Sequence, residues 1–159
     1  MLFWFGIQWY DMVYKSLIAA GWEVDHIPAL WIKPNGQTQL PQTNLARAYE
    51  TFFVCYKEHS VLKKPGRVNH FTFTPVASQE KYHPTQKPSA LYEELFKTFA
   101  WPAPPIGPDN PILVLFAGSG AAILTAMRMG YRAFGFDLVQ EYKEKFLAAA
   151  AKEFGEYII

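Results

Sequence analysis

The 159-residue sequence has little cysteine, little net charge and no long apolar run. Its single cysteine, Cys55, excludes an internal disulfide and a multi-cysteine zinc site, and we expect it to be a buried thiol in a reducing compartment. The 15 Lys and Arg residues nearly balance the 14 Asp and Glu residues. The net charge therefore neither indicates nor excludes a polyanionic partner such as nucleic acid. No apolar run reaches the ~20 residues that span a bilayer, and the aromatic first residues lack the basic start of a signal peptide. We therefore expect a cytoplasmic protein.

Half of the residues are hydrophobic, which is enough for one sizeable core in a chain of this length. Apolar spacing and turn signals predict alternating strands and helices without an internal repeat. The expected helices are residues 9–20, 89–99, 119–129 and 140–153, and the expected strands are residues 2–5, 22–32, 51–56, 112–116 and 131–137. Lys33-Pro34-Asn35-Gly36 is expected to end the second strand. The last strand–helix–strand unit, residues 112–137, has the length of a crossover that joins parallel strands. The predicted fold class is therefore α/β.

The stretch FAGSG, residues 116–120, connects a predicted strand to a predicted helix. Gly118 and Gly120 allow a sharp bend without a side chain in front of a ligand, and the helix start offers unpaired N–H groups to an anion. Asp137 ends the next strand, where a carboxylate can accept hydrogen bonds from both hydroxyls of a ribose. Together they favour a ligand that contains a nucleoside, although Ile123 stands where a dinucleotide fingerprint needs a third glycine. An ordinary tight turn and a helix cap at Asp137 are the alternatives.

The hexapeptide HPTQKP, residues 83–88, comes one predicted helix before FAGSG. This pairing resembles the DNA amino-methyltransferases, which use S-adenosylmethionine to methylate adenine N6 or cytosine N4, in the permuted class called beta. The segments LWIKPN and RAYETFFVCYK, and Gly135-Phe136-Asp137 followed by Tyr142, are similar to the same class. The resemblance covers essentially the whole chain.

The resemblance implies a site for S-adenosylmethionine. The carboxylate of its methionine part would lie at the turn, Asp137 would bind the ribose, and Leu138 would flank the adenine. The implied cofactor-binding residues are Phe116, Ala117, Gly118, Ser119, Gly120, Asp137, Leu138, Thr85, Gln86 and Lys87. No metal site is expected. The alternatives are structural, with His83 as a loop histidine, Lys87 as a solvated charge and Pro88 as a helix-start proline.

The sequence departs from the family pattern in three places. The family usually has Asp where this chain has Val114, and often Thr-Thr where it has Ala121-Ala122. Its catalytic motif is Asp, Asn or Ser followed by Pro-Pro and an aromatic residue, which stacks on a base flipped from the duplex. The single Pro-Pro here, Pro104-Pro105, lies between Ala103 and Ile106 and cannot perform that chemistry. The catalytic residues are therefore unknown.

The resemblance also predicts an incomplete sheet. The family strand order is 3-2-1-4-5-7-6, and this chain is read as strands 5, 7 and 6 followed by 1 and 2, without 3 and 4. We expect a single methyltransferase domain with post-catalytic strands in 1–57, a short loop similar to a target-recognition region in 58–82, and a cofactor-binding part in 83–159. A separate N-terminal methyltransferase chain would supply the other strands, or strands 1 and 5 would pair directly. Unpaired strand edges also favour self-association.

Three functions are left open by the sequence. The first is a site-specific DNA methyltransferase, or its C-terminal part, acting on double-stranded DNA. The second is a catalytically inactive module that binds S-adenosylmethionine and needs a partner chain. The third, a small-molecule methyltransferase, is disfavoured by HPTQKP. Any contact with DNA phosphates is expected at Lys63, Lys64 and Arg67, with a solvated basic loop as the alternative.

Overall fold

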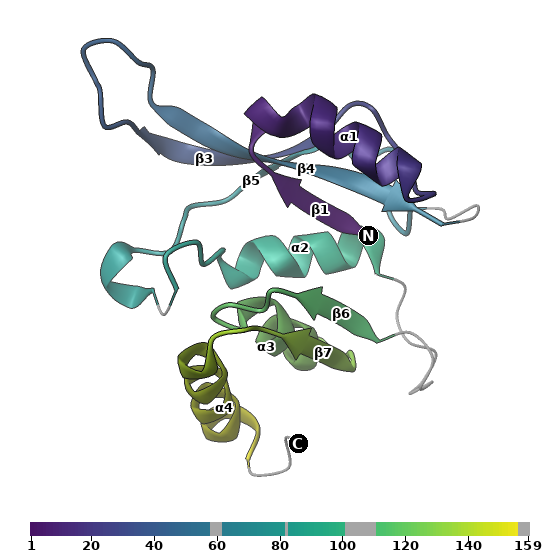
Figure 1. Cartoon of the computed structure of the whole chain (residues 1–159). Helices are drawn as coiled ribbons and strands as arrows, with labels where there is room; N and C mark the ends of the chain where they lie inside the picture. The colour runs from purple at the N-terminus through teal and green to yellow at the C-terminus, as the bar shows by residue number, and fades with distance from the viewer. Residues whose placement is uncertain (58–61, 82, 101–110, 156–159) are drawn as a thin grey trace. The chain divides into compact units, whose positions relative to one another are not determined.

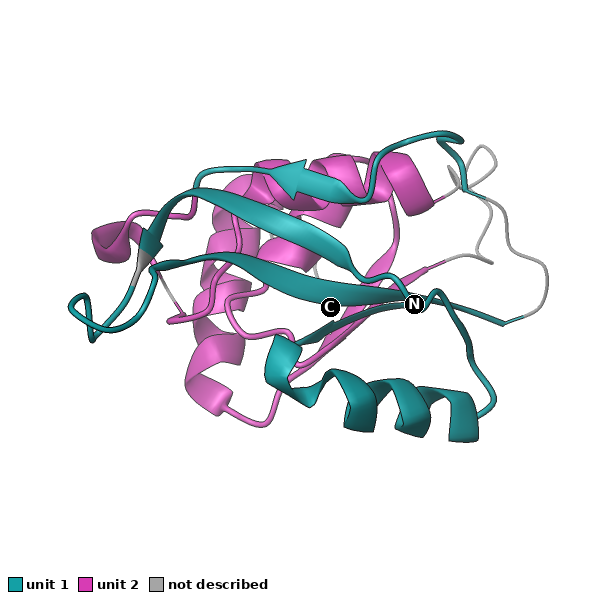
Figure 2. Ribbon diagram, turned by 90° about the horizontal axis from the view of Figure 1, so that it is seen from above, with its two compact units in different colours: residues 1–74 teal, residues 75–159 magenta. Residues whose placement is uncertain are grey.

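The computed structural model describes residues 1–57, 62–81, 83–100 and 111–155 (Figure 1). The chain divides into two compact units, Met1–Thr74 and Pro75–Ile159 (Figure 2). The expected single domain, with boundaries at 57 and 82, stays a prediction. No helix within the described residues has the length and apolarity to cross a membrane. Pro104-Pro105 lies outside the described residues.

Unit 1 is built on a mostly antiparallel sheet with strand order β1-β4-β3-β5, and a short β2 also pairs with β4. β4 is antiparallel to both β1 and β3, whereas β5 is parallel to β3. The adjacency β1-β4-β3 is that of family strands 5-7-6. The elements are β1 (Leu2–Phe5), a 3-10 turn η1 (Ile7–Trp9), α1 (Tyr10–Ala19), β2 (Glu23–Val24), β3 (Ala29–Gln37), β4 (Arg47–Tyr56) and β5 (His70–Thr72).

The core of unit 1 lies on both faces of β4, because successive side chains of a strand point to opposite faces. On one face, Phe53 and Cys55 pack with Leu17 of α1. On the other face, the Phe52 ring centroid lies 4.5 Å from the Trp4 ring centroid and 5.7 Å from the Phe71 ring centroid. The expectation of a buried cysteine is confirmed, and burial raises the pKa of the Cys55 thiol.

Two strand predictions in unit 1 are wrong. The segment 22–32 does not form one strand, because β2 ends at Val24 and β3 begins at Ala29. Nor does the sequence KPNG end the second strand, since β3 runs through it to Gln37. The register with β4 shifts between Ile32 and Gln37, so these residues form an irregularity within the strand. Turn residues can therefore bend a strand without ending it.

Unit 2 carries the strand–helix–strand unit that the sequence predicts. Its elements are a 3-10 turn η2 (Ser78–Glu80), α2 (Ser89–Phe99), β6 (Ile112–Leu115), α3 (Ala121–Arg128), β7 (Ala133–Phe136) and α4 (Gln140–Phe154). β6 and β7 pair in parallel, which confirms the α/β class. The described strands form two sheets, one in each unit, and direct pairing of family strands 1 and 5 stays a prediction.

The two faces of the β6–β7 pair differ. α3 lies against one face so closely that a β-carbon at Gly135 would overlap the Ile123 side chain. The other face exposes four large apolar side chains, which the register places in cross-strand pairs: Leu113 with Phe134 and Leu115 with Phe136. Parallel strands are normally covered on both faces. The bare face is therefore a surface that the described part of unit 2 does not cover.

Candidate functional site

The FAGSG turn bends the chain sharply at the carboxyl end of β6. Phe116, Gly118 and Gly120 all have positive φ angles, of 60°, 53° and 71°. Positive φ costs little for glycine but is unusual for a bulky residue such as Phe116. The Ala117 N–H donates to the Phe136 carbonyl at 2.8 Å, which ties the turn to the end of β7. The turn thus lies where ligands bind in open parallel sheets.

Asp137 closes this turn from the end of β7. One carboxylate oxygen accepts the Gly118 N–H at 2.7 Å, and the other accepts the Val139 N–H at 3.0 Å. These two backbone hydrogen bonds, that from Val139 first, hold the pKa of Asp137 below its ordinary value. The carboxylate therefore stays ionised beside Gly118. Each oxygen has a further lone pair for a ligand hydroxyl.

The HPTQKP loop meets the turn through His83. A β-carbon added at Gly118 would lie 3.4 Å from the His83 ring, so the ring lies beside this glycine at ordinary contact distance. The His83 ring also contacts the ring of Tyr142 in α4 edge-on, and the two ring centroids lie 4.5 Å apart. His83 Nδ1 accepts the Thr85 N–H at 3.2 Å and lies 3.0 Å from the Thr85 hydroxyl oxygen. Two motifs that are separated in the sequence are thus joined at one place.

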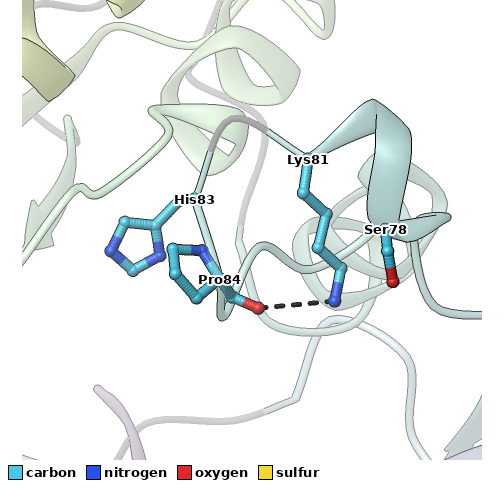
Figure 3. Close-up of a pocket in the computed structure, with 4 residues that line it drawn as sticks. All are labelled: Ser78, Lys81, His83 and Pro84. Carbon is cyan, nitrogen blue, oxygen red and sulfur yellow. Dashed lines mark hydrogen bonds between the residues drawn. The ribbon is translucent and has the colours of Figure 1, made fainter.

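An open pocket of about 330 Å³ lies beside this loop and is lined by Ser78, Lys81, His83 and Pro84 (Figure 3). The Lys81 ammonium donates to the Pro84 carbonyl at 3.3 Å. Sequence reasoning missed Ser78 and Lys81. The position of Lys81 two residues before HPTQKP was the available signal.

Gly120 is required by packing. A β-carbon at this position would overlap the ring of Phe146 in α4. The space beside Gly120 is therefore filled by this chain, whereas a β-carbon at Gly118 would make only ordinary contact with His83. Sequence reasoning also missed Phe146. It lies four residues after Tyr142, a spacing that places both on one face of a helix.

The remaining predicted cofactor residues lie around the turn or in the loop. Phe116 and Leu138 are 84% and 96% exposed, so two large apolar side chains stand uncovered at the ends of the two parallel strands. Ala117 and Ser119 are half-buried in the turn. Gln86 and Lys87 are also half-buried, and the Gln86 N–H donates to the His83 carbonyl at 3.0 Å. Ligand roles for these residues stay predictions.

The predicted DNA-contacting residues are held differently from one another. The Arg67 guanidinium donates to the Val68 and His70 carbonyls, both at 2.9 Å, and lies 3.8 Å from the Phe71 ring centroid. Arg67 therefore fastens its own loop to β5. Lys64 is exposed and Lys63 is half-buried. Within the described residues, no group of three metal-ligating side chains converges.

Solved structures with the same fold include two of M1.HpyAVI. The complex titled M1.HpyAVI-SAM matches with a TM-score of 0.73 and 20% identity, over 94% of this chain and 72% of that chain. The second M1.HpyAVI structure matches with a TM-score of 0.69 and 17% identity, over 94% of this chain and 71% of that one. PvuII DNA methyltransferase (cytosine-N4-specific) matches with a TM-score of 0.68 and 18% identity, over 97% of this chain and 59% of that one. These likenesses show the methyltransferase fold.

A curated relative, "Putative methylase YubD" of Escherichia coli (strain K12), is 32% identical over 65 residues. That match covers 41% of this chain and 26% of the relative, so this chain matches about a quarter of the relative's length. A family model described as DNA methylase, for the N6 and N4 methyltransferases, matches residues 7–150. The motifs and the fold agree with this match over most of the sequence, and the chain belongs to the DNA methylase family.

Proposed function

We propose that this chain forms the cofactor-binding part of a DNA amino-methyltransferase that transfers a methyl group from S-adenosylmethionine to adenine N6 or cytosine N4. The observation that carries the proposal is the meeting of His83 with Gly118, which joins HPTQKP to the glycine turn. The Asp137 carboxylate accepts the N–H of that same glycine. The two motifs of the DNA amino-methyltransferases thus make one structure rather than two unrelated turns.

The residues at this place fit the cofactor. Its ribose hydroxyls suit the lone pairs that remain on Asp137, and its adenine suits the exposed apolar surfaces of Phe116 and Leu138. The turn 116–120 and the donors of Thr85, Gln86 and Lys87 would hold the charged methionine end. When bound, S-adenosylmethionine supplies an electrophilic methyl group on a sulfonium. This chain's own residues would position it and exclude water from one side.

The acceptor side of the reaction needs a catalytic Pro-Pro-aromatic motif, which the 159 residues do not contain. We propose that this motif comes from further residues of a longer protein or from a separate N-terminal methyltransferase chain. The bare apolar face formed by Leu113, Leu115, Phe134 and Phe136 supports a complementing segment, because its burial would cover a parallel sheet that is otherwise half covered.

The same bare face favours a second function. A chain that binds S-adenosylmethionine but never meets a catalytic motif would act as an assembly module. The two functions differ in one assay: adding a chain with the catalytic motif would produce methylated duplex DNA only if this chain is an enzyme part.

Calorimetric titration of S-adenosylmethionine into the purified chain tests the cofactor site. We expect binding that Asp137→Ala abolishes, because the substitution removes the ribose acceptor and opens the turn. Glu144→Ala is the matched control, since Glu144 is an acidic residue of α4 that accepts from the Gln140 side chain at 3.1 Å and does not touch the turn. A folded chain that gives no binding heat would contradict the proposal, and so would equal binding by Asp137→Ala.

A further inference from the structure

We propose that the β3–β4 hairpin, residues 33–49, is an arm that enters a groove of duplex DNA and contacts base edges. This inference rests on the proposed function, because it assigns the surface through which that enzyme would meet its substrate. The hairpin carries none of the residues of the cofactor site. Its DNA contacts would be additional to those expected at Lys63 and Lys64.

The hairpin extends away from α1 and β1 of its own unit (Figure 1). It bends where the register between β3 and β4 shifts, between Ile32 and Gln37. A β-carbon at Gly36 would lie 3.0 Å from backbone atoms of Ala46 and Arg47, so glycine allows the two strands to approach closely there. Such irregularities increase local twist and redirect a strand. The direction of the arm is thus set by this irregularity in its own backbone.

The tip of the hairpin is a hydrogen-bonded turn. The Thr38 hydroxyl accepts the Leu40 N–H at 3.2 Å. The Leu40 carbonyl accepts the N–H groups of Thr43 and Asn44 at 3.2 and 2.8 Å. These hydrogen bonds hold the backbone of the turn in one conformation, which lowers the entropic cost of binding.

The composition of the hairpin suits nucleic acid. No Asp or Glu occurs from residue 33 to residue 49, although the whole chain has nearly equal numbers of acidic and basic residues. Lys33 pairs with Glu50 at 2.8 Å at the base of the arm, whereas the Arg47 side chain is exposed and makes no hydrogen bond or ion pair within the described residues. The arm therefore presents positive charge to a partner without an acidic side chain of its own to repel phosphates.

Side-chain amides are concentrated on this arm. The exposed ones are Asn35, Gln39, Gln42 and Asn44. Within the described part of the chain, these four amides make no side-chain hydrogen bond, so their donors and acceptors face solvent. Asn and Gln amides pair with the N6 and N7 edge of adenine, and a two-stranded ribbon fits the major groove. Leu45 is 94% exposed, which suits contact with a thymine methyl group.

Binding of short fluorescent duplexes of random sequence at low salt tests the arm, with sequencing of the duplexes retained. We expect Arg47→Gln to weaken all sequences alike and to lower the slope of log affinity against log salt by about one, because one phosphate contact is lost. The combined variant Gln39→Ala, Gln42→Ala, Asn44→Ala should weaken the preferred sequences by about tenfold or more and flatten the sequence preference. Gln8→Ala and Lys15→Gln are controls in the same unit and should bind as the unchanged chain does.

Three results would overturn the proposal. The first is an unchanged chain that does not retain duplex DNA. The arm would then be assigned to binding a protein instead. The second is a combined variant with the same affinity and the same retained sequences as the unchanged chain. The third is an Arg47→Gln variant with an unaltered salt slope. Titration of S-adenosylmethionine into each variant separates the two proposals. If the arm does not bind DNA, cofactor binding is still expected to persist. If the chain does not bind the cofactor, DNA binding by the arm can still be measured.

Discussion

The two sheets of this protein bury their apolar side chains to different extents. β4 in unit 1 has a strand on each side, and its neighbouring residues Phe52 and Phe53 are both fully buried, on opposite faces. β6 and β7 in unit 2 pair only with each other among the described strands, and Phe136 is 61% exposed. The unit that carries the HPTQKP loop and the glycine turn thus has the less complete sheet. Site geometry here depends on the turn and on α4 rather than on a fully covered sheet.

The largest effect should separate the two sheets directly. Phe53→Ala should lower the free energy of unfolding by about 3–5 kcal/mol, because the ring is fully buried and packs on Phe5, Tyr10 and Tyr14. Phe136→Ala should cost less than about 1 kcal/mol, since most of its ring already meets solvent. Urea denaturation followed by circular dichroism measures both. Equal losses would mean that the bare face of unit 2 is covered in solution.

A smaller effect should show how α4 holds the glycine turn. Gly120→Ala should destabilise unit 2 by about 2–4 kcal/mol, because positive φ is costly for alanine and the new methyl group would overlap Phe146. Gly130→Ala is the matched control, with φ of 79° and no atom within 4 Å of the added β-carbon, and should cost about 1–2 kcal/mol.

Thermal unfolding of both glycine variants gives the difference. Adding Phe146→Ala to Gly120→Ala should cost less than the sum of the two single changes, because the overlap is then removed. Strict additivity would show that α4 does not constrain the turn.

The smallest effect concerns the charge that closes the turn. The pKa of Asp137 is lowered in the folded chain, by the Val139 and Gly118 N–H groups first. Its contribution to stability is therefore fully present above the ordinary Asp pKa of about 3.9 and is lost as pH falls through the lower folded value. The stability difference between the unchanged chain and Asp137→Asn should be constant near neutral pH and shrink below about pH 4. A difference that does not change with pH would contradict the assigned hydrogen bonds.

Local signals in the sequence predicted several elements well. The helix expected at 89–99 is observed with those bounds, and Gly21 and Gly118 have the positive φ values that their turns need. The strand stop at KPNG was wrong because a register shift absorbs Pro34 and Gly36 within β3. Residues 70–72 gave no strand signal, since β5 is too short for alternation and is defined by its pairing with β3.

The sequence by itself determined the family, the α/β class and the two motifs, because these depend on residue types at short spacings. Only the tertiary structure decided which groups meet: the His83 ring on Gly118, the Phe146 ring on Gly120 and the Asp137 carboxylate on a backbone N–H. It also decided which apolar side chains stay bare, since the pattern of β7 is compatible with coverage on either face. The physical reason is that packing and pairing join residues far apart in the chain, and local propensity carries no information about those partners.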